Sequence, residues 1–172
     1  MNFNRRHFLT TALIGSAGVV YYFKGKKVSL FDDKVQVILA TAYHLYPTSP
    51  LGFGVKEIHL ASYLAFVLAD KRILQEDRDY LSRGGTWIQE EALAKYGKSF
   101  LVLSHEQKEM LLQEIKDFDW GYNYIHYLFT YIFEAMFSAP IYGSNIKKIT
   151  WKWSGHNPGF PQPSRIEDIE YE

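Results

Sequence analysis

The chain contains no cysteine among its 172 residues. This absence excludes disulfides, thiolate-held iron–sulfur clusters, Cys-x-x-Cys-His haem attachment and cysteine-based zinc sites in this chain. A Gly-x-Gly-x-x-Gly loop, a Walker loop and the Gly-x-Ser-x-Gly elbow of hydrolases are also missing, so nothing supports nucleotide or flavin binding. We therefore predict no catalytic residue, no metal site and no cofactor in this chain.

The chain also lacks an excess of charge of either sign, because 19 basic residues balance 19 acidic ones. Proteins that bind nucleic acid usually present a basic face, so we expect no nucleic-acid partner. Aromatic residues, by contrast, make up 17% of the chain. Tyr, Phe and Trp gather in cores and at protein interfaces, which predicts either a dense core or a contact with another protein.

The N-terminal region carries a paired arginine, Arg5 and Arg6, followed by Phe8, Leu9 and a modest apolar run. This pattern predicts a twin-arginine export signal. Twin-arginine export carries folded proteins, often with a cofactor already inserted, yet this chain shows no cofactor site. Either such a site is hidden, or the signal serves a second protein that travels with this one.

Residues 1–27 are interpreted as this signal, or as an N-terminal anchor if they are not removed. The small residues Gly15-Ser16-Ala17 offer a cleavage site, although without the preferred Ala-x-Ala pattern. An uncut helix from Phe8 to Phe23 would be about 24 Å long, shorter than the ~30 Å hydrocarbon core of a bilayer.

Apolar residues recur at helical spacing through the next part of the chain, which predicts an all-α fold. We expect helices over Lys34–Tyr46, Val55–Ala69, a stretch from Glu76 to Tyr96 that Gly84-Gly85 interrupts, a segment opening at Ser104, and Tyr122–Phe137. Ser104 with Gln107 three residues later is a capping box, a strong start signal. Alternation typical of a strand is confined to the six residues Lys148–Trp153.

Residues 28–138 are therefore predicted to form a single irregular helical domain, and residues 139–172 an extended aromatic arm. The arm contains four of the six prolines. Within it, Tyr142-Gly143-Ser144-Asn145 suggests a tight turn with positive φ values, followed by Trp151, Trp153 and Gly155. Two interpretations stay open: this turn packs against its own domain, or it forms a rigid aromatic surface for a partner.

The histidines outside the signal show no spacing typical of a metal-binding helix. Neighbouring Lys or Arg residues make the carboxylate pairs, such as Glu90-Glu91, better explained as solvated helix faces. An independent periplasmic enzyme or metal-binding protein that uses histidine and carboxylate ligands is the alternative to a partner-binding subunit. A weaker alternative is a membrane-tethered binding module that keeps its N-terminal segment.

Several motifs, in order along the chain, resemble the gluconate 2-dehydrogenase subunit 3 family. They are Gly85-Thr86-Trp87-Ile88, Tyr96-Gly97-Lys98-Ser99-Phe100, Leu103-Ser104-His105-Glu106-Gln107 and Phe137-Ser138-Ala139-Pro140-Ile141-Tyr142-Gly143-Ser144-Asn145, with Trp151 and Gly155 beyond them. The resemblance covers most of the chain after about Asp32 and includes the twin-arginine leader. Ser144 stands where the family usually has a second glycine.

The resemblance implies a small, non-catalytic subunit of a membrane-associated flavin dehydrogenase in the periplasm, at the inner membrane. It implies that the chain binds a large FAD-containing subunit without a signal of its own, and that the twin-arginine translocase exports the pair. A cytochrome c subunit with haem c is a possible third member. Partner contacts are expected at the turn and arm residues Tyr142, Gly143, Asn145, Trp151, Trp153 and Gly155. The substrate, gluconate or a related sugar or sugar acid, belongs to the large subunit.

Overall fold

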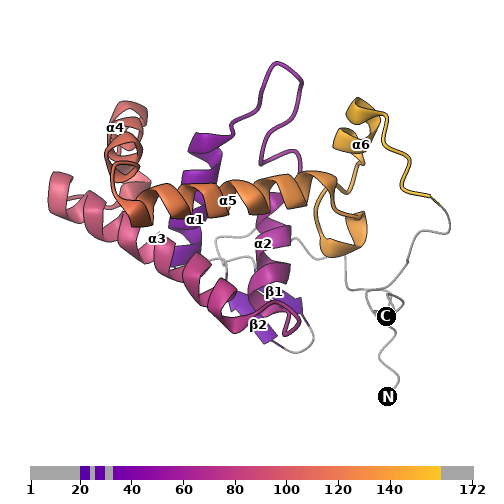
Figure 1. Cartoon of the computed structure of the whole chain (residues 1–172), viewed down its shortest axis with the longest axis horizontal. Helices are drawn as coiled ribbons and strands as arrows, with labels where there is room; N and C mark the ends of the chain where they lie inside the picture. The colour runs from indigo at the N-terminus through magenta and orange to yellow at the C-terminus, as the bar shows by residue number, and fades with distance from the viewer. Residues whose placement is uncertain (1–19, 24–25, 30–32, 160–172) are drawn as a thin grey trace.

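The computed structural model describes residues 20–23, 26–29 and 33–159 of the chain (Figure 1). Within these ranges, six α-helices, two 3-10 turns and one short hairpin follow one another along the chain. They are β1 Val20–Phe23, β2 Lys26–Ser29, α1 Asp33–Leu45, α2 Leu60–Ala69, α3 Gln75–Tyr96, η2 Phe100–Val102, α4 His105–Ile115, α5 Asp119–Phe137, η3 Pro140–Tyr142 and α6 Ile149–Ser154. The predicted all-α domain is confirmed.

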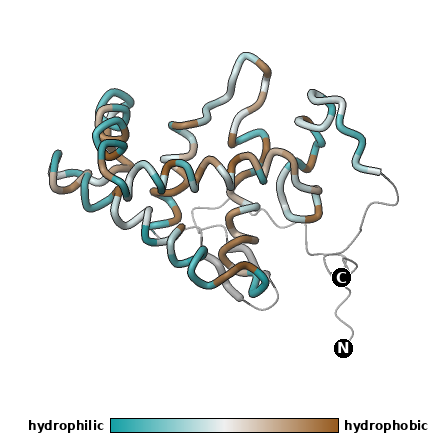
Figure 2. Tube along the Cα trace, viewed as in Figure 1, coloured by the Kyte–Doolittle hydropathy of each residue, from teal (hydrophilic) through white to brown (hydrophobic). Residues whose placement is uncertain are grey.

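Helix α5 is the central element of the fold, and it runs across the middle of the molecule in Figure 1. It contacts α1, α2, α3, α4 and α6. Its inner side is apolar and fully or nearly fully buried, with Tyr124, Leu128, Ile132 and Ala135 at helical spacing. Figure 2 shows hydrophobic residues along α2 and α5, whereas α4 is mostly hydrophilic. The core therefore lies where α5 covers the other helices.

Helix α3 is continuous, so the predicted interruption at Gly84-Gly85 is wrong. Both glycines are buried because neighbouring elements approach the helix closely there. A Cβ atom on Gly84 would lie 1.8 Å from the Tyr124 ring, and one on Gly85 would lie 2.5 Å from the Lys34 carbonyl oxygen. The glycines thus serve helix packing. The helix ends at Tyr96, as the sequence predicts, where Gly97 is the C-cap with a left-handed φ of 63°.

The predicted start of α4 is confirmed in atomic detail. The Ser104 hydroxyl accepts a hydrogen bond from the Gln107 backbone N–H at 3.2 Å, and the Gln107 side chain accepts one from the Ser104 N–H at 3.1 Å. This reciprocal pair is a capping box, which satisfies donors that the first helical turn leaves open.

Two element boundaries differ from the prediction. Helix α2 begins at Leu60 rather than Val55, because His59 adopts a left-handed φ of 60° that separates the preceding turns from the helix. The strand-like alternation at Lys148–Trp153 lies mostly in α6, which Lys148 precedes and Gly155 ends with left-handed dihedral angles. Six residues are too few to distinguish the two-residue alternation of a strand from the 3.6-residue spacing of a helix.

The hairpin of β1 and β2 was not predicted from the sequence. The strands pair antiparallel, with Val20 opposite Ser29 and Phe23 opposite Lys26, and both contact α2. Val20–Phe23 therefore does not continue a helix from Phe8. Beyond α5, the described part of the arm is less extended than expected, because η3 and α6 fold it back; residues 160–172 lie outside the described part.

Candidate functional site

The turn after α5 has the geometry that the sequence predicted. Gly143 lies at φ 91° and Asn145 at φ 48°, both in the left-handed region. Ser144 is not among the described residues with positive φ, so a serine fits where the family usually has glycine. Its hydroxyl lies 2.7 Å from that of Ser138, which closes the turn onto the end of α5.

Asn145 fixes the turn to two other segments. Its side chain is fully buried, its backbone N–H donates to the Ile58 carbonyl at 2.9 Å, and its carboxamide oxygen accepts from the Thr150 N–H at 3.4 Å. The turn is therefore connected to the segment before α2 and to the first turn of α6. The side-chain nitrogen Nδ2 of Asn145 is buried and has no hydrogen-bond partner among the described residues.

Trp151 is also a component of the interior, with only 4% of its surface exposed. Its indole N–H donates to the Phe137 carbonyl at 2.9 Å, and the neighbouring Thr150 hydroxyl donates to the Met136 carbonyl. These bonds satisfy carbonyls that the C-terminal end of α5 leaves open. The burial of Trp151 and Asn145 favours, for these two residues, the interpretation that the turn packs against its own domain.

The other predicted contact residues remain accessible. Tyr142 is partly buried, whereas Trp153 is 53% exposed and rests its ring edge-on against Phe53, with 5.6 Å between ring centroids. Gly155 is exposed at the end of α6 with φ 67°. Tyr142 and Trp153 thus offer surface that another protein can reach.

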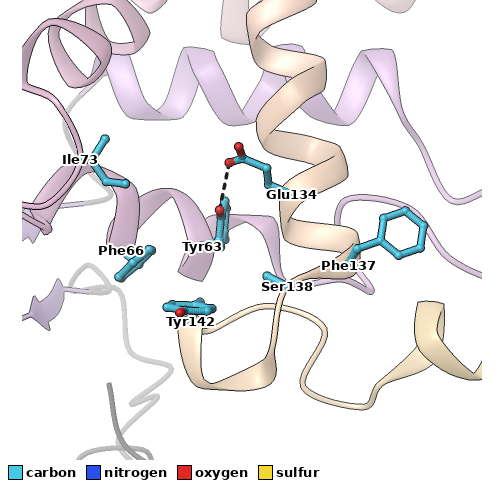
Figure 3. A pocket seen from close by; sticks show the side chains of 7 residues that line it. All are labelled: Tyr63, Phe66, Ile73, Glu134, Phe137, Ser138 and Tyr142. Atoms are coloured by element: carbon cyan, nitrogen blue, oxygen red, sulfur yellow. Dashed lines mark hydrogen bonds between the residues drawn. The ribbon is translucent and has the colours of Figure 1, made fainter. Parts of the chain in front are cut away.

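An open hollow of about 410 Å³ lies between α2, η3 and the end of α5 (Figure 3). Three aromatic rings form its wall, with centroid distances of 5.9 Å from Tyr63 to Phe66 and 5.1 Å from Phe66 to Tyr142. The Tyr63 hydroxyl donates to the Glu134 carboxylate at 3.0 Å. Ile73, Ser138 and Phe137 complete the lining, and Figure 3 shows the Phe137 ring directed away from the three aromatic rings.

Tyr63 stays a hydrogen-bond donor in this hollow. Burial raises the pKa of its phenol well above the ordinary value of 10.0, and the neighbouring Glu134 carboxylate raises it further. The phenol is therefore neutral at physiological pH and keeps its proton for the bond to Glu134. Burial likewise raises the pKa of Tyr124, whose hydroxyl donates to the Leu81 carbonyl at 3.2 Å.

The outer side of α5 carries a row of rings that the sequence interpretation did not assign to partner contact. We call it the aromatic flank; its members, at steps of four, three, four and four residues, are Tyr122, His126, Phe129, Phe133 and Phe137. Tyr122, Phe133 and Phe137 are 52%, 50% and 45% exposed. The other half of the outer side is polar, with Asn123, Thr130 and Glu134. Helical spacing in an unusually aromatic segment was the signal available in the sequence.

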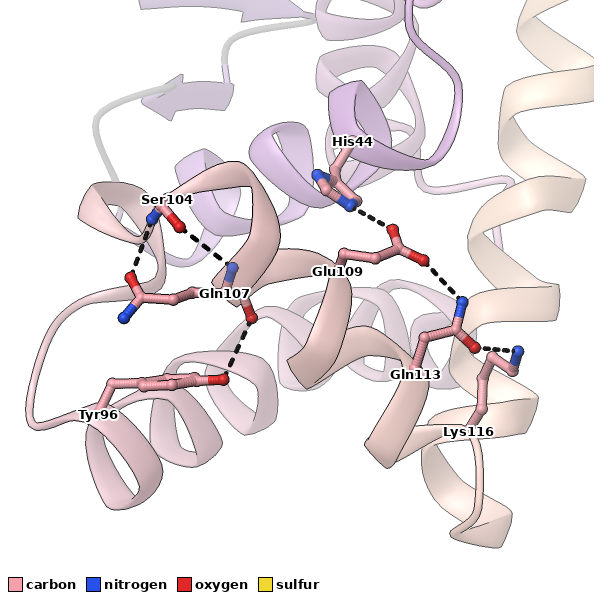
Figure 4. A network of polar contacts seen from close by, with 7 residues as sticks. All are labelled: His44, Tyr96, Ser104, Gln107, Glu109, Gln113 and Lys116. Carbon is pink, nitrogen blue, oxygen red and sulfur yellow. Dashed lines mark hydrogen bonds and ion pairs between the residues drawn. The ribbon is translucent and has the colours of Figure 1, made fainter.

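Among the described histidines, His44 and His105 are in ring contact, but the five do not form one cluster. His44 on α1 has its side chain 5% exposed, bonds to Glu109 on α4 at 2.8 Å, and lies 4.5 Å from the His105 ring between centroids. Figure 4 shows this contact continuing to Gln113 and Lys116 along α4. In the part of the chain that the structure describes, no three His, Asp or Glu residues are grouped closely enough to hold a metal ion.

The predicted export residues Arg5, Arg6, Phe8 and Leu9 lie outside the described residues. Among the helices of the described ranges, none is both long and apolar enough to cross a membrane.

Comparison with known proteins identified one family. Residues 32–159 match the family model described as gluconate 2-dehydrogenase subunit 3. Neither the curated proteins nor the solved structures gave a match. The matched range runs from the start of α1 through the turn and α6, so it includes the hollow and the aromatic flank.

Proposed function

The chain belongs to the gluconate 2-dehydrogenase subunit 3 family, and from this premise we propose that it is the non-catalytic small subunit of a periplasmic, membrane-associated dehydrogenase complex. The complex oxidises gluconate or a related sugar or sugar acid on an FAD-containing large subunit. This chain supplies the twin-arginine signal for both subunits and stabilises the large one. A cytochrome c subunit with haem c receives the electrons.

The observation that carries this proposal is the family match over nearly all of the helical domain. The aromatic flank supports it physically. Three rings of one helix, Tyr122, Phe133 and Phe137, are each about half exposed, although burying apolar surface is favourable by about 25 cal/mol per Å². A row of exposed aromatic rings along one helix is typical of a protein contact. The flank therefore supports a subunit that functions in a complex.

The absence of cysteine and of glycine-rich nucleotide loops in the sequence supports the division of labour between subunits. FAD needs a cradle of backbone N–H groups for its pyrophosphate, usually at a glycine-rich turn before a helix. The proposal places that cradle in the large subunit, and haem c in a third chain. The small subunit then contributes a binding surface and the export signal.

The test is co-purification from the native envelope with a tag at the C-terminus of this chain. We expect a stoichiometric large partner, together with the absorbance bands of an oxidised flavin that bleach when gluconate or another substrate is added. A variant with Phe133→Ser and Phe137→Ser serves as the negative control for specific capture. A lone colourless protein would refute the complex, and metal analysis of that protein would then test the histidine and carboxylate alternative.

A further inference from the structure

We propose that the hollow beside Glu134 receives a cationic side chain, an arginine or lysine, from the large subunit. This inference rests on the proposed function, because it names the chemistry by which that partner is recognised. Its basis is an acid, at the edge of an aromatic wall, that forms no ion pair with another described residue. The hollow is lined by Tyr63, Phe66, Tyr142 and Glu134 with Ile73, Phe137 and Ser138.

Glu134 provides the negative charge. Its carboxylate is exposed, and among the described residues no Lys, Arg or His lies within ion-pair distance of it. One oxygen accepts the hydrogen bond from Tyr63 at 3.0 Å, which fixes the carboxylate over the hollow (Figure 3). A carboxylate has about four lone-pair sites in all, so most of its acceptor capacity remains for an incoming donor.

The aromatic wall provides the second part of a cation site. Cations are attracted to the faces of Tyr, Phe and Trp rings within about 6 Å of the ring centroid. The Tyr63, Phe66 and Tyr142 rings follow one another at 5.9 Å and 5.1 Å, which makes a wall long enough for a planar guanidinium or the stem of a lysine. The combination of neighbouring aromatic rings and a carboxylate favours a cation over an anion or a purely apolar group.

Arg72 is a cation of this chain that contacts the aromatic wall, and it is already engaged. Its guanidinium carbon lies 6.0 Å from the Phe66 centroid, and its Nε and Nη2 atoms donate to the Asp70 carboxylate at 2.5 to 3.0 Å. Asp70 thus balances the charge of Arg72. This contact also shows that the Phe66 ring accepts a guanidinium at its surface.

The hollow and the aromatic flank are adjacent at the last turns of α5. Glu134 and Phe137 both line the hollow, Phe137 also belongs to the flank, and Figure 3 shows its ring directed away from the three rings of the wall. One partner that covers the end of α5 can therefore bury the flank and place a cation in the hollow. The apolar flank supplies contact area, and the Glu134 contact fixes the orientation.

The test measures how fast a differently tagged copy of this chain exchanges into the purified complex. We expect Glu134→Gln, which keeps the shape and the Tyr63 bond, to exchange about tenfold faster than the native chain and with a weaker dependence on salt. Glu90→Gln removes one exposed charge from α3 and should exchange at the native rate. Equal thermal melting of both variants excludes a folding defect.

The absence of native cysteine makes the contact directly identifiable. Ile73→Cys, labelled with a maleimide photo-crosslinker, should capture a large-subunit peptide that contains an arginine or lysine. A charge reversal tests the pair: Glu134→Lys in this chain, combined with a glutamate in place of the captured cation in the large subunit, should restore the slow subunit exchange of the native complex.

If Glu134→Gln exchanges into the complex at the native rate, or if the captured peptide contains no cation, the proposal is overturned. The proposed function would still stand, because the large subunit would still co-purify. Lower melting of the isolated Glu134→Gln chain with native exchange would instead show that basic residues of this chain fill the hollow. Failure of the native chain to co-purify any flavoprotein would refute the proposed function itself.

Discussion

At the scale of single residues, Gly84 and Gly85 show how the context of a residue decides its role. Both lie in the interior of α3, although glycine is about 1 kcal/mol less favourable than alanine in a helix interior. The close approach of Tyr124 and of the α1 backbone offsets that cost, because no Cβ atom fits at either position. The two glycines allow α3 to contact α1 and α5 closely.

Gly84→Ala should therefore destabilise the domain although alanine is the better helix former. Its Cβ would lie 1.8 Å from the Tyr124 ring, and the ring is fully buried, so it cannot move away without disturbing the core. We expect a loss of about 2 to 3 kcal/mol in the free energy of unfolding, typical of overpacking. Urea denaturation followed by circular dichroism measures it, with Glu90→Ala on the exposed side as control. A change below about 0.5 kcal/mol would contradict the close packing.

Trp151 and Trp153 are two residues apart but should respond differently to truncation. Trp151 is buried and donates to the Phe137 carbonyl, so Trp151→Ala should cost about 3 to 5 kcal/mol of folding stability. Trp153 is half exposed, so Trp153→Ala should leave most of the stability intact and weaken association with the large subunit by about 2 kcal/mol. Thermal melting and subunit-exchange rates separate the two effects. If Trp151→Ala and Trp153→Ala lose the same folding stability, Trp153 has a structural role rather than a role in partner contact.

At the scale of elements, α5 combines two functions on opposite sides. Its inner side organises the core through contacts with five other helices. Its outer side presents the aromatic flank next to a polar half. Mutations on the two sides should therefore affect different measurements, folding on the inner side and association on the outer one.

The double variant Phe133→Ser, Phe137→Ser should weaken association with the large subunit by more than tenfold, because these neighbouring rings of the flank are both about half exposed. The isolated chain should melt at or near the native temperature, since both rings are already about half exposed to water. Asn123→Ala with Thr130→Ala, on the polar half of the same helix, is the matched control. Native association of the serine variant would exclude the flank as the interface.

The contact between α1 and α4 should make stability depend on acid pH. Hydrogen bonds from Gln113 and His44 lower the pKa of Glu109 below its ordinary value of 4.5. The folded state then binds fewer protons than the unfolded state, so this stabilisation is complete above the ordinary pKa and is lost as pH falls through the lower folded value.

We therefore expect the free energy of unfolding of the native chain to decrease between about pH 5 and about pH 3. Glu109→Gln should show a smaller decrease over that range, whereas Glu90→Gln should retain the native one. Urea titrations at several pH values provide the measurement. Identical pH profiles for the native chain and Glu109→Gln would show that this contact does not contribute to acid sensitivity.

At the scale of the whole molecule, non-covalent contacts hold the domain without a disulfide, because the chain has no cysteine. Its net charge of zero gives no long-range attraction to a charged partner. Recognition must therefore come from local surfaces such as the flank and the hollow. The proposed export route adds one requirement, that the complex assembles before it crosses the membrane.

Lysine in place of both Arg5 and Arg6 should leave this chain and the large subunit in the cytoplasm, if the arginines form the export signal of both. The reason is that the large subunit has no signal of its own in the proposed complex, so both folded subunits depend on the signal of this chain. Cell fractionation with immunoblotting for both subunits, together with a dehydrogenase assay on intact cells, measures the outcome. Replacement of Lys26 and Lys27 by Arg is the control for basic residues outside the motif. Periplasmic activity of the double lysine variant would refute the shared signal.

Local features of the fold could be read from the sequence because they depend on neighbours along the chain. The capping box of Ser104 and Gln107, the stop at Gly97 and the positive φ values at Gly143 and Asn145 are set by contacts within a few residues. The all-α class follows from apolar spacing in the same way. The ordered motifs that resemble the family also lie in the sequence, and the family match confirms that resemblance.

The tertiary structure decided what depends on residues far apart in the chain. Only packing against Tyr124 shows that Gly84 continues a helix, and only burial separates Trp151 in the interior from Trp153 at the surface. The hollow likewise needs α2 beside α5, because Tyr63 and Glu134 are 71 residues apart. Sequence periodicity specifies which side of a helix is apolar, but the packed fold alone determines which apolar residues remain for another protein.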